Sequence, residues 1–259
     1  MILENTKELS IPPSRIISLV PSITSLLHHL HLEQAVIGIT KFCNKPAHWH
    51  NEKNIIGGTK NIQIEKIKLL NPDLIIANRE ENVKEQVNEL ATLFPLWLTD
   101  VNNLEDNYTM IEDIGVLTHQ SELSENLILN IKNEFAVHSL ENKPKKRAAY
   151  LIWNEPYMTV GGDTFISDLL DKAGYINVFK EEKRYPIITL DDLNEKACDC
   201  IFLSSEPYPF KEKHIQEIKR YIQNIEIHLV DGVFFSWYGS EILKSPQYFK
   251  ELFTRCDKS

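Results

Sequence analysis

The sequence is poor in the residues that build disulfide frameworks and clustered metal sites. Its 259 residues include only 4 cysteines, and none of them lies in the paired CxxC spacing of a zinc site. We therefore interpret Cys43, Cys198, Cys200 and Cys256 as reduced thiols that belong mostly to the core. The sequence predicts no metal site.

Long apolar runs are also missing. No stretch approaches the roughly 20 apolar residues that a membrane helix needs, and residues 1–15 do not contain the apolar segment of a signal peptide. As written, the chain is therefore expected to be cytoplasmic.

Common catalytic motifs are absent as well. The sequence has no GxSxG, GxxxxGK[ST] or HExxH, and no GxGxxG after its first strand, and Ser22 has no assignable base. Residues 161–164 (GGDT) precede a helix, where they form either a tight turn or an anion site of backbone amides. We expect a protein that is not an enzyme and carries no cofactor.

Positive charge is scarce. The chain has 28 basic and 37 acidic residues, a net charge of −9, and its only basic cluster is residues 143–147. A polyanion groove needs a concentrated positive field, so this balance argues against a nucleic-acid partner. We expect a monomer that docks on basic membrane components without entering the membrane.

A strand, a loop and a helix recur in both halves of the chain. Residues 15–20 form an apolar run followed by Ser22, a candidate helix cap, and by apolar residues at i, i+3, i+4 and i+7. Residues 148–153 form a second such run, and the helix after Thr164 repeats the four offsets and stops at Gly174. The repeat predicts duplicated lobes.

Each half also carries an acid that opens a short amphipathic helix before a buried strand. Glu65 precedes Asp73 by eight positions, and Asp191 precedes Asp199 by eight positions. The strands that follow are continuous apolar runs, which is typical of parallel strands covered on both faces. Either acid could simply cap its helix, where negative charge is favoured.

The pattern between the halves is helical and lacks strand signals. Residues 121–140 would form a helix of about 30 Å that ends before Pro144. We predict an N-terminal α/β lobe at 1–103, a helical connector at 104–142 and a C-terminal α/β lobe at 143–259.

Aromatic residues gather in loops that would follow strands of the second half. Since ligands of open parallel sheets bind beyond the carboxyl ends of the strands, these loops predict a surface for a ring system. Some of these residues could instead cap the core. The clusters are Trp153 to Tyr157, Tyr185 with Pro186, Tyr208 to Phe210, and Phe234 to Tyr238 with Trp237 among them.

Two further groups have open interpretations. Asp231 follows an apolar strand, where it could accept a hydrogen bond from a ligand or simply form a turn. His48 and His50 resemble metal ligands, but without a third ligand we interpret them as solvated.

Read together, four segments resemble the helical-backbone metal receptor superfamily, the class III periplasmic substrate-binding proteins of ABC importers. The segments are RIISLVPSITSLLHHL, VIGITKFCNKPAHW, GGTKNIQIEKIKLLNPDLIIAN and TVGGDTFISDLLDKAGYINVF, and they look most like the cobalamin-binding branch. The resemblance implies two Rossmann-like lobes with parallel sheets, a long helix that joins them, a ligand cleft between the lobes, and a periplasmic or cell-surface location.

The resemblance also implies residue roles. It places Glu65 and Asp191 at the acids that bind arginines of the permease subunits. Phe42, Trp153, Tyr185 and Asp231 match ligand positions, whereas Thr59 and Asn78 stand where the cobalamin receptor has tryptophans. The candidate ligand-binding residues are therefore Phe42, Arg79, Trp153, Tyr157, Tyr185, Tyr208, Asp231 and Trp237.

We therefore expect an ABC-importer binding protein that captures cobalamin or a related corrinoid and delivers it to a permease. The same scaffold could bind an iron siderophore or haem, for which Lys41, Arg79, His48 and His50 would supply contacts. A cytoplasmic ligand-binding or enzymatic relative is the third possibility.

Overall fold

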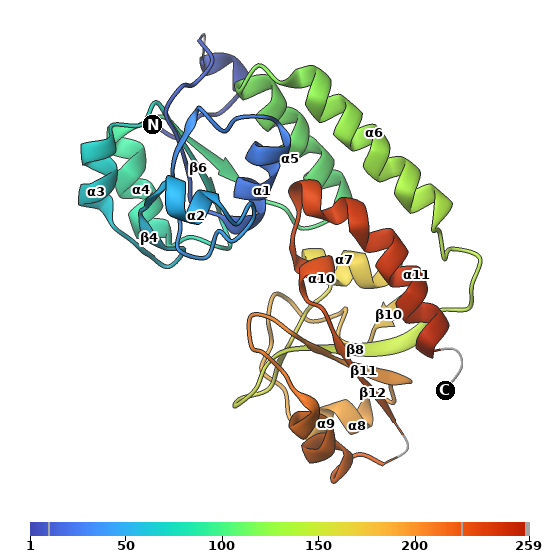
Figure 1. The fold of residues 1–259 in the computed structure, drawn as a ribbon. Coiled ribbons are helices and arrows are strands. Elements are labelled where there is room, and N and C mark those ends of the chain that lie inside the picture. Colours follow the sequence, from blue (N-terminus) through green and yellow to red (C-terminus); the bar gives the residue numbers. More distant parts are fainter. Residues whose placement is uncertain (10, 224, 257–259) are drawn as a thin grey trace. The chain divides into compact units, whose positions relative to one another are not determined.

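Each half of the chain folds around its own parallel sheet. The computed structural model describes residues 1–9, 11–223 and 225–256. One unit comprises Met1–Val101, Glu105–Asn130 and Tyr238–Glu241, and the other comprises Asn102–Leu104, Ile131–Trp237 and Ile242–Ser259. Figure 1 shows the strands of each unit with helices on both sides.

The sheet of the first unit has the order β3-β2-β1-β6-β7, and all its neighbouring strands are parallel. Helices α3 and α4 lie on one side of it and α1 and α5 on the other (Figure 1). Its elements are η1 (Thr6–Glu8), β1 (Ile16–Ser18), α1 (Pro21–His29), β2 (Val36–Ile39), α2 (Trp49–Glu52), β3 (Asn54–Ile55), the antiparallel pair β4 (Gly57–Gly58) and β5 (Asn61–Ile62), α3 (Ile64–Leu70), β6 (Leu74–Asn78), α4 (Lys84–Leu93) and β7 (Leu96–Thr99).

The first helix confirms the apolar stripe but not the cap. Ile23, Leu26 and Leu27 are fully buried, as the periodicity predicts. The expected cap at Ser22 is wrong, because the helix begins at Pro21 and the N-cap is Val20, without a side-chain hydrogen bond. Proline is favoured at the first helical position because its missing N–H has no intrahelical partner there.

The sheet of the second unit has the order β10-β8-β11-β12, and the short β9 pairs with β8 in the antiparallel sense. Helices α8 and α9 lie on one side of these strands, and α7, α10 and α11 lie on the other (Figure 1). Its elements are β8 (Lys146–Trp153), β9 (Met158–Thr159), α7 (Phe165–Lys172), β10 (Tyr175–Asn177), α8 (Leu190–Glu195), β11 (Cys200–Ser204), α9 (Glu212–Lys219), β12 (Glu226–Val230), α10 (Val233–Ser236) and α11 (Ser245–Cys256), and η2 (Gly239–Lys244) precedes α11.

The two sheets share one topology. If β1 is matched with β8 and β6 with β11, the order β2-β1-β6-β7 becomes β10-β8-β11-β12. Helices α1 and α7 then follow equivalent strands, as do α4 and α9. The duplication predicted from the acid spacing and the apolar stripes is confirmed, and so is the prediction of α/β lobes with parallel sheets.

An arginine and an aspartate close the amino edge of each sheet. In the first unit Asp73 accepts hydrogen bonds from Ser14 N (2.8 Å), Ser14 Oγ (2.9 Å) and Arg15 N (2.8 Å). The Arg15 guanidinium donates to the carbonyls of Asn71 and Leu70 at the end of α3. We call this arrangement the arginine–aspartate clasp.

The second unit has the same clasp. Asp199 accepts from Arg147 N at 2.7 Å, and the Arg147 guanidinium donates to the carbonyls of Ala197 (3.2 Å) and Lys196 (2.8 Å). Ala197 has φ +47°, matching φ +45° at Asn71, so a left-handed residue follows both short helices, directly after α3 and one position beyond the C-cap of α8. The aspartates that were noticed only for their spacing therefore join two parallel strands at their start.

Two helices lie between the lobes in sequence. They are α5 (Leu104–Leu117) and α6 (Ser121–Val137), and the 17 residues of α6 span about 26 Å at the usual rise. Residues 121–130 of α6 belong to the first unit and residues 131–137 to the second. The boundaries at residues 103 and 142 stay a prediction. No helix in the described part of the chain is long and apolar enough to cross a membrane.

Candidate ligand-binding site

Three loops of the second unit meet where its parallel strands end. They follow β8, β11 and β12, which are neighbours in the sheet. The carboxyl ends of adjacent parallel strands lie at one edge, so residues far apart in the sequence come together there. Trp153 ends β8, Tyr208 lies in the loop after β11, and Trp237 follows α10 in the segment after β12.

Trp153 and Tyr208 form the exposed aromatic part of this edge. Their ring centroids are 5.6 Å apart in an edge-to-face arrangement, and the Trp153 side chain is 40% exposed. Tyr208 also packs on Phe210, which is buried. The tryptophan therefore keeps an open face while its partner is anchored in the core.

His214 fixes the hydroxyl of Tyr208. Lys211 N donates to His214 Nδ1 at 2.8 Å, so the proton of this buried imidazole lies on Nε2. Nε2 then donates to the Tyr208 hydroxyl at 3.1 Å, and Asn154 donates to the same oxygen at 3.4 Å. Because its oxygen accepts from both, the Tyr208 hydroxyl is left to act as a donor.

Glu206 holds the indole of Trp237. Its Oε1 accepts hydrogen bonds from Trp237 Nε1 at 2.9 Å and from Ser236 Oγ at 2.5 Å. Ser236 belongs to α10, so the carboxylate links the loop after β11 to the segment after β12. The aromatic position of Trp237 thus depends on an acid in a different loop.

Asp231 has the turn role that was one of its two interpretations. Its Oδ1 accepts from Val233 N at 3.1 Å and from Ser205 Oγ at 3.4 Å, and its backbone N–H donates to the Tyr248 hydroxyl. The residue is exposed. Only one carboxylate oxygen takes part in these side-chain bonds, so a ligand contact by the other stays a prediction.

Tyr157 and Tyr185 are half-buried. Burial raises the pKa of the Tyr157 hydroxyl, and the charges of Glu217 and Glu155 raise it further, so Tyr157 is a neutral donor at physiological pH. The Arg184 guanidinium lies 5.8 Å from the Tyr185 ring centroid, which is cation–π contact.

The first unit places Phe42 and Arg79 in loops after its own strands. Phe42 is 53% exposed, and a Cβ on Gly58 would come within 3.1 Å of its ring, so glycine is what lets the ring lie against that backbone. Lys41 Nζ is 5.0 Å from the Phe42 ring centroid. Arg79 Nη1 is 3.0 Å from Asp100 Oδ2, which offsets the charge an anionic ligand would use.

Thr59 and Asn78, the positions that depart from the tryptophan pattern, are buried. Asn78 is 2% exposed. Its Nδ2 donates to the Thr99 hydroxyl at 3.1 Å, and its Oδ1 accepts from the backbone N–H groups of Glu80 and Glu81. Its side chain is therefore fully used in shaping the loop after β6. Neither residue offers a ligand an aromatic face.

Residues 161–164 form a turn and not an anion site. The N–H groups of Gly161 and Gly162 donate to the carbonyls of Arg184 (2.7 Å) and Glu182 (3.0 Å), so these amides are occupied. Thr164 caps α7 by accepting from Ser167 N. A Cβ on either glycine would lie within 2.4 Å of a backbone oxygen, which explains the glycine pair.

The two spaced acids lie in the first turns of equivalent short helices, α3 and α8, but neither is the cap. Gln63 is the N-cap of α3, and Thr189 is that of α8, so capping by Glu65 or Asp191 is wrong. Glu65 is 84% exposed and pairs with Lys68 at 2.6 Å. Asp192, next to Asp191, completes a capping box with Thr189, which holds the pKa of Asp192 below its usual value.

The sequence and structure match known binding proteins. The model of the periplasmic binding protein family matches residues 16–223. The chain belongs to this family. The resemblance drawn from the sequence is confirmed, and because the family consists of solute-binding proteins, so is the expectation that this chain is not an enzyme.

Curated relatives share about a quarter of the aligned residues with this periplasmic binding protein. The vitamin B12-binding protein of Vibrio vulnificus (strain CMCP6) is 26% identical over 202 residues, which cover 74% of this chain and 72% of the relative. An ABC transporter substrate-binding lipoprotein of Bacillus subtilis (strain 168) is 24% identical over 212 residues, which cover 72% and 67%.

Solved structures share the fold. The periplasmic vitamin B12 binding protein BtuF of Vibrio cholerae superposes with a TM-score of 0.80 at 20% identity and covers 96% of this chain and 99% of its own. The periplasmic heme-binding protein RhuT from Roseiflexus sp. RS-1 gives 0.78 at 16% identity and covers 94% and 98%. At these identities the superpositions establish the fold alone.

Of the candidate residues of this periplasmic binding protein, the second unit brings Trp153 into contact with Tyr208 and joins Trp237 to the same edge through Glu206. Sequence reasoning missed Glu206 and His214, which position these rings. A glutamate just after a buried strand was a usable signal, but nothing local predicted its partner Trp237, 31 positions away.

Proposed function

We propose that this periplasmic binding protein is the substrate-binding component of an ABC importer and that it binds cobalamin or a related corrinoid. The observation that carries the proposal is the aromatic edge of the second unit, where Trp153, Tyr208 and Trp237 lie at or beyond the carboxyl ends of three adjacent strands. Curated relatives that bind vitamin B12 support the same ligand class.

The chemistry of the edge suits a large ring with amide substituents. Aromatic faces contribute about 0.5–1.5 kcal/mol each beyond the area they bury. The Tyr208 hydroxyl offers a donor, and the exposed Asp231 carboxylate offers an acceptor for an amide N–H. A corrin ring with its amide side chains uses all three kinds of contact.

A direct binding measurement tests the ligand. We expect equilibrium dialysis with cyanocobalamin to give one site per chain and a Kd of about 1 µM or lower, near −8 kcal/mol. Trp153→Ala should weaken binding about tenfold, whereas Trp97→Phe, within strand β7, should leave it unchanged. Absence of cobalamin binding at millimolar concentration, with saturation by haem or a ferric siderophore, would assign the site to another metal chelate.

We further propose that Glu65 and Asp191 dock the protein on arginines of the permease subunits. Both acids lie in the first turn of matching helices of the duplicated units, and both are exposed. Asp192 satisfies the capping requirement of α8, so Asp191 is not needed for that purpose. An exposed carboxylate at the same place on each unit is a geometry that two equivalent permease subunits can bind.

If Glu65 and Asp191 serve docking, their removal should affect transport but not ligand binding. We expect Glu65→Ala combined with Asp191→Ala to abolish importer-dependent uptake while the Kd for ligand stays within about twofold, because both exposed acids lie in the first turns of α3 and α8 and not in the loops after β8, β11 and β12. Lys68→Ala is the matched control: it removes the partner of Glu65 but should leave uptake intact. Loss of ligand affinity in the double variant would show that these acids do not serve docking.

A further inference from the structure

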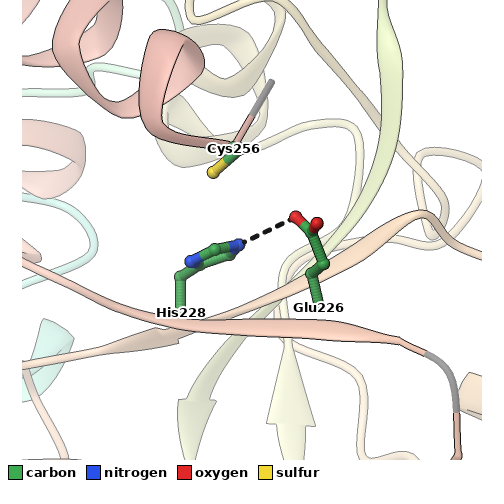
Figure 2. Close-up of side chains that lie close together, drawn as sticks. All are labelled: Glu226, His228 and Cys256. Carbon is green, nitrogen blue, oxygen red and sulfur yellow. Dashed lines mark hydrogen bonds and ion pairs between the residues drawn. The ribbon is translucent and has the colours of Figure 1, made fainter. Parts of the chain in front are cut away.

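Three side chains of different chemistry converge at the amino edge of the second sheet. Glu226 is the first residue of β12, His228 follows two positions later, and Cys256 ends α11. Their ligand atoms all lie within 4.8 Å of one another, and Figure 2 shows the thiol, the imidazole and the carboxylate turned toward a common point. The ligand-binding loops occupy the opposite, carboxyl edge of the strands.

The fold itself does not require polar residues here. In the first unit, strand β7 holds the place of β12, and the pairing registers put Pro95 and Trp97 at the positions of Glu226 and His228. This match follows from the clasp aspartates, because Asp73 directly precedes β6, which pairs with β7, and Asp199 directly precedes β11, which pairs with β12. The cluster is therefore specific to the second unit.

The spacing of the three groups fits a tetrahedral ion. His228 Nε2 and Glu226 Oε2 are 3.2 Å apart, while nitrogen and oxygen ligands of tetrahedral zinc lie about 3.3 Å apart. A thiolate sulfur would lie about 3.5 Å from either, so bringing Cys256 Sγ inward by about 1 Å completes three corners.

The charge of the cluster also suits a divalent cation. One thiolate and one carboxylate with a neutral imidazole balance Zn²⁺, which accepts sulfur, nitrogen and oxygen together. The thiolate is the form that binds metals.

A buried hydroxyl beside the cluster gives an independent indication. Tyr175 is fully buried, and its hydroxyl has no oxygen or nitrogen partner among the described residues; the Cys256 sulfur beside it is the group placed to accept from it. A neutral thiol is a weak acceptor, whereas a metal-bound thiolate accepts well and would satisfy this hydroxyl. Lys146 Nζ meanwhile donates to the Cys256 carbonyl and so fixes the end of α11.

We propose that Glu226, His228 and Cys256 form a structural Zn²⁺ site, with a water as the fourth ligand, that fastens the end of α11 to the edge of the second sheet. Binding converts the Cys256 thiol to a thiolate and releases its proton to solvent. No oxidation or reduction is involved. The site is separate from the ligand-binding loops, so it is independent of the proposed function.

The test measures Zn²⁺ alone on the full chain, freed of metal by a chelator and kept reduced with a phosphine. We expect one Zn²⁺ per chain in a competition titration with a chromogenic chelator, and a sulfur-to-metal charge-transfer band when Co²⁺ replaces Zn²⁺. Cys256→Ser and His228→Gln should each weaken binding at least about 100-fold, and Tyr175→Phe about tenfold. The Co²⁺ band of the unmodified chain does not depend on whether any variant folds.

The control is Cys198→Ser, a thiol in the same unit outside the cluster, which should leave Zn²⁺ affinity unchanged. Zn²⁺ binding that survives Cys256→Ser would place the ion elsewhere, for instance on the exposed His48 and His50, and would overturn the proposal. Absence of Zn²⁺ binding, or a Co²⁺ spectrum without a sulfur band, would overturn it equally.

Discussion

The arginine–aspartate clasp gives the two units an internal comparison of stability. Asp73 accepts three hydrogen bonds, two of them from Ser14, whereas the side chain of Asp199 accepts one, from Arg147 N. The difference arises because Lys146 stands in the place of Ser14: it has no hydroxyl there, and its N–H donates to the Gly174 carbonyl.

These counts set the expected magnitudes. A hydrogen bond to a charged acceptor contributes about 1.5–3 kcal/mol when it is fully desolvated. Asp73 is half-buried and its donors regain water when it is removed, so we use roughly 0.7 kcal/mol per bond. Asp73→Ala should then lower the free energy of unfolding of its unit by about 2 kcal/mol, and Asp199→Ala that of its own unit by less than about 1 kcal/mol.

Urea denaturation followed by tryptophan fluorescence can measure both effects. Each unit contains two tryptophans, so a background with Trp153→Phe and Trp237→Phe reports the first unit alone, through Trp49 and Trp97, and a background with Trp49→Phe and Trp97→Phe reports the second unit alone. A loss of 2 kcal/mol should move the midpoint by roughly 0.7–1 M urea. If Asp199→Ala lowers the stability of its unit as much as Asp73→Ala does, the number of hydrogen bonds does not determine how much each clasp stabilises its unit.

Three further outcomes are expected. Gly174→Ala should cost roughly 3 kcal/mol in urea denaturation, because φ is +84° and the new Cβ would lie 2.8 Å from the Phe253 ring; a loss below 1 kcal/mol would contradict this. Burial, and then Glu112, raises the pKa of Asp113, so its contribution to stability falls as pH rises through that pKa; Asp113→Asn should be more stable than the unmodified chain at pH 7, with the advantage vanishing at low pH. Glu206→Ala should weaken ligand binding about tenfold in calorimetry with little change in the urea midpoint, because it frees the Trp237 indole; unchanged affinity would remove Trp237 from the site.

The sequence predicted the architecture where its pattern was long or repeated. The apolar runs that became β6 and β11, the stripes of α1 and α7, and the eight-residue acid spacing all pointed to duplicated α/β lobes. The two-residue strands β3 and β9 were missed because so short a segment has no periodicity to detect.

Local rules failed where another residue competed for the same role. Ser22 is a good cap by type, but Pro21 occupies the first helical position and moves the cap to Val20. Asp191 is a good helix-opening acid, but Thr189 and Asp192 already form the capping box. In both cases the outcome depended on a neighbour one or two positions away.

The sequence predicted the type of ligand-binding site but not the contacts that orient its residues. Aromatic loops after strands indicated a ring-binding edge, but the partners that orient Trp237 and Tyr208 are tertiary. The cluster at Cys256 had no signal at all, because its thiol lies 28 positions from His228 and a single cysteine carries no spacing.

The segment Tyr238–Glu241 belongs to the first unit although the residues on both sides belong to the second. Gly239 N donates to Asn107 Oδ1 at 2.6 Å, and Glu241 accepts from Ser25 and Lys45, each at 2.7 Å. A truncation at residue 143 would therefore strip the first unit of contacts to its own helices. Fragment expression and split-reporter designs based on a single cut should yield two incomplete halves, and a protease nick within residues 143–237 should not release either one.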